Sequence, residues 1–122
     1  TTAKPVSARD RQLAQARRME ADGSLPDALL AYRAIADAGD PRGLTRLAWL
    51  YEAGRGVPRN LAEAARLFRQ AAEAGDPEGQ YALSVMFDTG AGQPHDSEQA
   101  LRWLRAAAAG GYPPAIEALK AR

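Results

Sequence analysis

Few side chains in this sequence of 122 residues could perform nucleophilic or metal chemistry. It contains one histidine, His95, and no cysteine. Its four serines are Ser7, Ser24, Ser84 and Ser97. None of these serines lies in a G-x-S-x-G turn, and serine hydrolysis also needs a base and a group that orients it. A structural zinc site needs about four His, Cys or carboxylate ligands. The sequence therefore predicts no catalytic residue, no metal site and no cofactor, and places His95 in a solvated loop.

Charge and composition exclude further classes of protein. The 16 Lys and Arg residues nearly cancel the 15 Asp and Glu residues, leaving a net charge of +1. A nucleic-acid-binding domain would carry a clear basic excess. No apolar run approaches the roughly 18 residues that cross a bilayer, so we expect no direct membrane insertion. There are 28 alanines but only five Val and Ile residues together, which predicts an all-α fold.

The elements that position these residues repeat every 36 positions. The string Ala38-Gly39-Asp40-Pro41 recurs at 74–77, and Gly110-Gly111-Tyr112-Pro113 is a third, altered copy. Residues 38–73 and 74–109 share 14 identities without a gap. A period of this length is typical of stacked helical hairpins. We expect one domain with a linker or trimmed leader (1–6), a diverged hairpin (7–37), the two repeats and a C-terminal capping helix (110–122).

Each repeat is predicted to contain two helices with defined ends. Asp40 and Asp76 are candidate N-caps followed by proline at the first helical position. Gly54 and Gly90 stand where a left-handed C-cap would end the first helix. Further pairs resemble capping boxes, namely Asn60 with Glu63, Asp96 with Gln99, Ser7 with Asp10 and Ser24 with Asp27. Gly43 and Gly79 occupy equivalent helical positions, which predicts a close approach of two backbones there.

Two motifs carry a resemblance to a known family. The pattern Leu47-Ala48-x-x-Tyr51-x-x-Gly54-x-Gly56-Val57-Pro58-x-Asn60 is similar to the opening of the Sel-1-like repeat. The pattern Ala64-x-x-Leu67-Phe68-x-x-Ala71-Ala72-x-x-Gly75 resembles its close, and the second copy has Trp103 at the tryptophan position of the family. The first hairpin, with Gly23, Ala28 and Tyr32, looks more like an ordinary tetratricopeptide repeat. The resemblance implies antiparallel helix hairpins stacked into a right-handed superhelical α-solenoid.

The related tetratricopeptide repeats bind partners on the concave side, through their first helices. Carried over by position, that resemblance implies two sets of groove residues: Arg42, Thr45, Trp49 and Glu52, then Glu78, Tyr81, Val85 and Asp88. Trp49 and Tyr81 would form an aromatic shelf, since aromatic residues dominate interface energetics. The alternative is that Trp49 packs between repeats as part of the core.

A second candidate surface is a basic stripe on the second helices, formed by Arg33, Arg69 and Arg105 at the repeat spacing. An acidic partner could bind this stripe. The alternative is a solvated face whose arginines pair with nearby carboxylates. Residues 38–73 carry +2 and residues 74–109 carry −3. Opposite charges at the two ends would favour weak head-to-tail self-association of an otherwise monomeric chain.

The resemblance implies a non-enzymatic adaptor or scaffold that binds a protein or peptide in its concave groove. In bacteria such proteins resemble parts of the envelope machinery, including polysaccharide-secretion scaffolds and toxin-immunity factors, so we expect a periplasmic or envelope-associated protein. One alternative is a structural spacer within a longer solenoid. Another is a cell-wall-directed hydrolase, for which the sequence lacks a complete set of catalytic residues.

Overall fold

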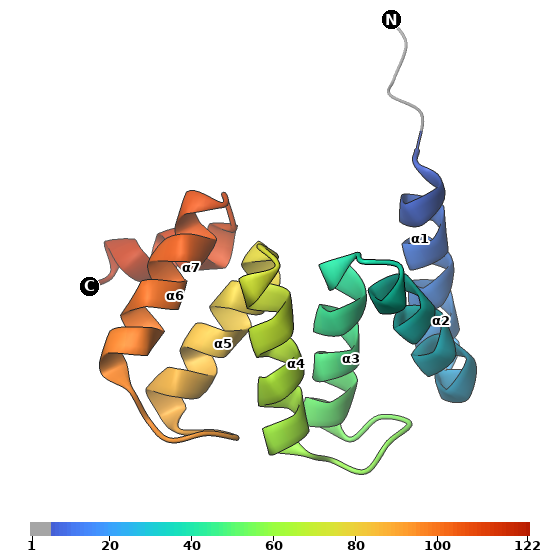
Figure 1. Cartoon of the computed structure of the whole chain (residues 1–122), viewed down its shortest axis with the longest axis horizontal. Coiled ribbons are helices and arrows are strands. Elements are labelled where there is room, and N and C mark those ends of the chain that lie inside the picture. Colours follow the sequence, from blue (N-terminus) through green and yellow to red (C-terminus); the bar gives the residue numbers. More distant parts are fainter. Residues whose placement is uncertain (1–5) are drawn as a thin grey trace, which may run out of the picture.

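The computed structural model describes residues 6–122, which form seven α-helices and no strand (Figure 1). Of the predicted leader at 1–6, all but the last residue lie outside the described residues. The helices are α1 (Ala8–Ala21), α2 (Leu25–Asp37), α3 (Pro41–Ala53), α4 (Leu61–Glu73), α5 (Pro77–Thr89), α6 (Ser97–Ala109) and α7 (Pro113–Lys120). The all-α prediction is confirmed.

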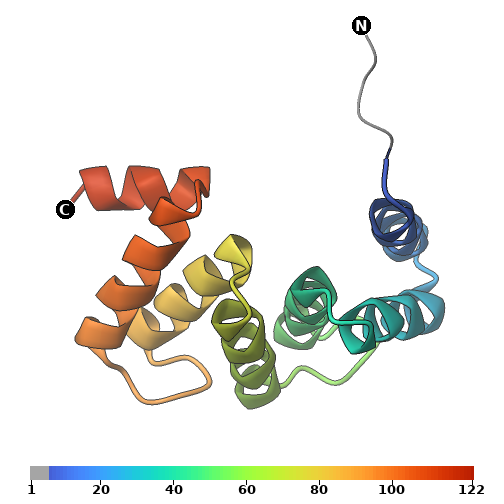
Figure 2. The same ribbon diagram turned by 45° about the horizontal axis from the view of Figure 1, so that its top comes forward.

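Each helix packs against the next one along the chain, so the hairpins α1–α2, α3–α4 and α5–α6 stack in order. The first helices of successive repeats also meet, since α3 contacts α5. Figure 2 shows the hairpins following a curved path instead of closing into a globule. In an open stack of this kind each hairpin contacts only the neighbouring hairpins, and the helices expose a continuous face to a partner.

Side chains close in sequence define most helix ends, as predicted. The Asp40 carboxylate accepts from the Arg42 amide at 3.0 Å, and Asp76 accepts from the Gly79 amide at 3.0 Å. Gly54 and Gly90 end α3 and α5 with φ values of 66° and 75°. Both angles lie in the left-handed region that glycine adopts without a Cβ penalty.

Three capping predictions need correction. Asn60 and Asp96 do accept from the amides of Glu63 and Gln99, at 3.0 and 3.1 Å. Their own amides, however, donate to carbonyl oxygens near the end of the preceding helix, so neither capping box is reciprocal. Each of these bonds folds the long loop back onto the helix before it. Ser24 precedes α2 but makes no side-chain cap hydrogen bond.

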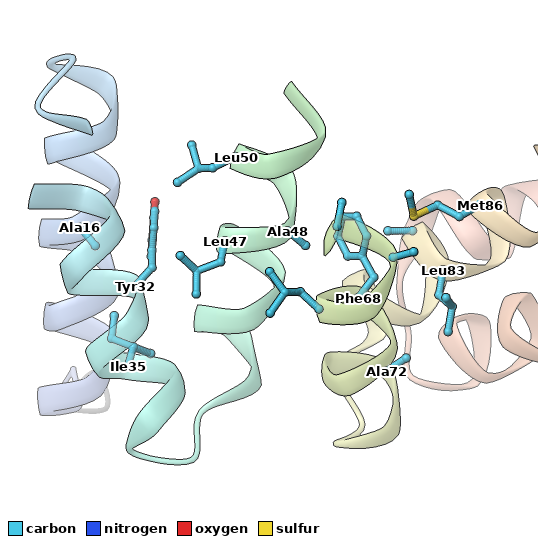
Figure 3. Packing of buried hydrophobic residues seen from close by; sticks show 14 of the residues in the cluster. Ala16, Tyr32, Ile35, Leu47, Ala48, Leu50, Phe68, Ala72, Leu83 and Met86 are labelled. Carbon is cyan, nitrogen blue, oxygen red and sulfur yellow. The ribbon is translucent and has the colours of Figure 1, made fainter. Parts of the chain in front are cut away.

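The core is a row of buried side chains that runs through the stack (Figure 3). Its largest fully buried members are Tyr32, Leu47, Leu50, Leu67, Phe68 and Leu83. Small residues let the backbones approach: a Cβ at Gly43 would lie 2.6 Å from both the Tyr32 carbonyl oxygen and the Ala36 amide nitrogen. A contact that short is sterically forbidden, which confirms the predicted close approach of α3 to α2.

The C-terminal end has a smaller apolar cluster of its own. Leu104, Ala107 and Ala115 form its buried part. Ala115 lies on α7, so this helix covers the end of α6, while Ile116 and Leu119 remain half-buried. Among residues 6–122, no helix is both long and apolar enough to cross a bilayer.

Candidate interaction surface

The first helices present most of the predicted groove residues, but not all of them. Seven of the eight are accessible to different degrees: Trp49, Glu52 and Tyr81 are half-buried, as are Arg42 and Glu78, and Val85 is 42% exposed. Asp88 is exposed as well. Thr45 is only 1% exposed. We use the name first-helix face for the accessible residues together with one more that the structure adds, namely Arg42, Arg46, Trp49, Glu52, Glu78, Tyr81, Val85 and Asp88.

Thr45 therefore cannot contact a partner, and its place among the groove residues is corrected. Its hydroxyl donates to the Asp76 carboxylate at 2.5 Å. It also faces Gly79, where an added Cβ would lie 3.1 Å from the threonine oxygen. The glycine lets α5 approach α3 closely enough to cover Thr45. The threonine and the N-cap of α5 thus form one buried polar junction between the two repeats.

Glu78 is the central residue of the first-helix face. Its carboxylate accepts from the indole N–H of Trp49 at 2.8 Å and forms an ion pair with Arg46. Partial burial of Arg46 lowers the pKa of its guanidinium below the ordinary value for arginine. Arg46 was not among the predicted groove residues. Its position one helical turn after Arg42, on the same side of α3, is the signal that could have identified it.

Arg42 links the first hairpin to α3. Its guanidinium contacts Asp10 of α1 at 2.8 Å and the N-cap Asp40 at 2.7 Å. Hydrogen bonds from Arg42 lower the pKa of both carboxyl groups below the ordinary value of 3.8. This arginine is already engaged twice, so a partner could bind it only in competition with these carboxylates.

Glu20 makes a second link at the same junction. It accepts from the buried Tyr32 hydroxyl at 2.7 Å and from Arg55, in the loop after α3, at 3.0 Å. Burial, followed by the nearby Glu20 carboxylate, raises the pKa of Tyr32 above its ordinary value of 10.0. No local sequence pattern indicates this contact, because it joins α1, α2 and a loop that are distant in sequence.

The two aromatic side chains of the predicted shelf pack against different neighbours. Trp49 contacts the Phe68 ring edge-on at a centroid distance of 4.9 Å, and it packs against the main core. Tyr81 lies against Tyr112 at 5.4 Å, in the C-terminal cluster. Trp49 therefore combines both interpretations: its ring packs on the core, and its N–H reaches the first-helix face.

The members of the predicted basic stripe differ in their surroundings. The Arg69 guanidinium lies 5.4 Å from the centre of the Phe87 ring and donates to the Gln93 side chain at 3.2 Å. Cation–π contacts of this kind hold an arginine in place. Arg33 and Arg105 are exposed. The middle of the stripe thus contributes to the contact between α4 and α5.

The few side chains that could perform nucleophilic or metal chemistry are scattered over the structure. His95 lies on the exposed loop after α5, with its Nε2 3.3 Å from the Ser97 hydroxyl. In the described part of the chain, no group of three His, Cys, Asp or Glu side chains could hold a metal ion. Ser84 is buried and donates to the Tyr81 carbonyl oxygen at 2.6 Å, as expected of a small packing residue.

Comparison with known proteins identifies the repeats. A family model described as Sel1 repeat matches residues 41–76 and 77–112. No curated protein matches the chain. A solved Sel1 repeat protein from Oxalobacter formigenes is 27% identical, with a TM-score of 0.78 over 92% of this chain and 48% of that one. A protective antigen with an SLR fold from uropathogenic Escherichia coli is 26% identical, with a TM-score of 0.78 over 91% of this chain and 25% of that one.

Helicobacter pylori cysteine rich protein B has the same fold at 18% identity, with a TM-score of 0.72 over 91% of this chain and 96% of that one. This chain spans about half the length of the Oxalobacter protein and a quarter of the length of the Escherichia antigen. The likeness confirms the predicted solenoid of helical hairpins.

Proposed function

Because this chain belongs to the Sel1 repeat family, we propose that it is a non-enzymatic interaction module that binds a peptide or protein on its first-helix face. The observation that carries the proposal is the arrangement around Glu78. One carboxylate holds both Arg46 and the Trp49 indole, so side chains from α3 and α5 are fixed before a partner arrives. Fixing side chains in advance lowers the entropy cost of binding.

The proposed contact area lies beside this fixed centre, on α5. Val85 and Asp88 are exposed, Tyr81 is half-buried, and the three lie on one side of the helix because their spacing is three or four residues. An apolar, an aromatic and an acidic side chain in one row can bind an apolar segment that carries a basic group. We propose that the partner belongs to the bacterial envelope; the similar structures come from bacteria, which supports a bacterial partner.

Site-specific photo-crosslinking tests the proposal. A photoreactive amino acid at Val85 should crosslink one defined partner from a bacterial envelope extract, and Tyr81→Ala should reduce the yield several-fold. The same amino acid at Arg105, on the basic stripe, is the matched control and should give no adduct with that partner. Equal adducts from both positions would contradict binding at the first-helix face.

A further inference from the structure

A hollow of about 280 Å³ lies between α1 and α2. The residues that line it belong neither to the first-helix face nor to the basic stripe. The residues that matter to its chemistry are Arg9, Gln12 and Met19 of α1 and Ala31, Ala34 and Ile35 of α2. They recur every three or four positions on each helix, so the hollow follows the seam between the two antiparallel helices. We call it the α1–α2 hollow.

The repeat spacing explains why the hollow exists. Ala31 stands 36 residues before Leu67, and Leu67 stands 36 residues before Trp103. Leu67 is fully buried in its hairpin, and Trp103 packs half-buried against the core in the next one. The first hairpin has only a methyl group at this position. Close-packed interiors normally leave few voids larger than water, so the missing side chain leaves space that the fold does not fill.

Other side chains of the first hairpin do not compensate for the small residue. Ile35 stands where the later repeats have Ala71 and Ala107, and it is buried, yet it lines the hollow without closing it. Met19 lines the hollow from α1, on the wall opposite Ile35 of α2, and is half-buried. Methionine is flexible and polarisable, and such side chains adapt readily to an incoming apolar group.

The chemistry of the rim selects the charge of an occupant. Arg9, Gln12 and Gln15 supply N–H donors, and within residues 6–122 no carboxylate lines the hollow. Arg9 makes one long contact, from its Nη1 to the Ile35 carbonyl oxygen at 3.5 Å. Its guanidinium has five N–H donors, so several remain to bind a carboxylate.

We propose that the α1–α2 hollow binds one tryptophan or leucine side chain of an acidic peptide segment. The repeat register indicates which side chains suit this space, because Leu67 and Trp103 stand at the equivalent position and are fully and half-buried in the other two hairpins. Arg102 even places its guanidinium 5.2 Å from the centre of the Trp103 ring, the combination of charge and ring that Arg9 would offer to a bound tryptophan. A carboxylate beside the tryptophan would pair with Arg9.

Nuclear magnetic resonance on the full chain tests this proposal. The probe is acetyl-Glu-Trp-Glu-amide, added to protein labelled with nitrogen-15. We expect saturable shifts of the backbone amide signals of Met19, Ala31 and Ala34. Two control peptides, acetyl-Glu-Gly-Glu-amide and acetyl-Lys-Trp-Lys-amide, should bind at least several-fold more weakly, because one lacks the ring and the other lacks the carboxylates.

Substitutions locate the contact on the protein. Ala31→Trp introduces the ring that the third hairpin has at this position, fills the hollow from within and should weaken binding of the probe at least tenfold. Arg9→Gln should weaken binding of the probe several-fold and make that binding less dependent on salt. The matched control is Leu30→Ala, on the same helix but 71% exposed and outside the hollow, which should leave binding unchanged. If Ala31→Trp fails to fold by circular dichroism, Ala34→Leu blocks the rim instead.

Three outcomes would overturn the proposal. The first is the absence of saturable shifts at α1 and α2 with the acidic tryptophan peptide. The second is unchanged binding by the filled or blocked variant. The third is a shift of the same amides on raising the protein concentration alone, which would identify a second copy of the chain as the occupant.

Discussion

The N-terminal hairpin and the two later hairpins build the same stack in different ways. The later hairpins fill their interiors with Leu67 and Trp103, and long loops lead into the capped helices α4 and α6. The first hairpin has Ala31 at the equivalent position and an uncapped Ser24. It is joined to the rest by polar side chains, such as Glu20 and Arg42. The regular repeats thus fill an interior position that the diverged hairpin leaves open, while hydrogen bonds and ion pairs between side chains cross the junctions in both regions.

The largest effect should come from removing the interior side chain of a filled hairpin. Leu67→Ala would create in α3–α4 a hollow like the one in α1–α2. Because Leu67 is fully buried, we expect a loss of about 3 kcal/mol in the free energy of unfolding. Urea unfolding followed by circular dichroism measures it. Leu30→Ala, at an exposed site, is the control and should change stability by less than about 0.5 kcal/mol. Equal losses from both would mean that the middle hairpin is not held by this packing.

The helix caps should also distinguish the two regions. Asp96 accepts a hydrogen bond from the Gln99 amide, so Asp96→Ala should cost about 1 kcal/mol. Ser24 makes no such bond, so Ser24→Ala should cost less than about 0.5 kcal/mol. Thermal unfolding of the two variants measures the difference. A cost for Ser24→Ala as large as that for Asp96→Ala would remove this distinction.

Filling the hollow in the first hairpin should raise the free energy of unfolding instead of lowering it. Ala31→Leu copies the side chain of the second hairpin into the hollow and should stabilise the chain by about 0.5 to 1 kcal/mol. Chemical unfolding checks the sign, with Ala34→Gly on the same helix as a destabilising control for helix propensity. Destabilisation by Ala31→Leu would show that the walls of the hollow lie too close for a leucine.

The smallest effect should be a dependence on pH at the junction of the two regions. Arg42 lowers the pKa of Asp10 and Asp40 below the ordinary value of 3.8. Carboxyl groups with a lowered pKa in the folded chain stabilise it above that value, and the stabilisation disappears as the pH falls through the folded-state pKa. We therefore expect the melting temperature to drop below about pH 4. Arg42→Ala should show a smaller drop than the parent chain, and an equal drop would place the acid sensitivity elsewhere.

Features that depend on residues close together in the sequence were predicted correctly, whereas features that depend on residues of different helices were missed. The N-cap of α3 was predictable because Asp40 bonds an amide two residues away, and the C-cap because Gly54 needs only its own backbone angle. The burial of Thr45 was not predictable, because the atoms that cover it belong to Asp76 and Gly79, at the cap and on the helix of the next repeat. The role of Arg46 was missed for the same reason, because its partner lies on α5.

The period, the helices and the family could be predicted from the sequence alone, because each of these depends on residues within one repeat. The 36-residue spacing, the small residues and the caps are local features, and local hydrogen bonds and sterics suffice to interpret them. Which side chains remain accessible, in contrast, depends on how the helices pack against one another. Trp49 and Glu78 become one unit when α3 and α5 pack together, and Ala31 leaves a hollow only because α1 lies across from it. Whether a side chain is exposed depends on the helices that pack beside it, so the sequence of one helix alone does not determine it.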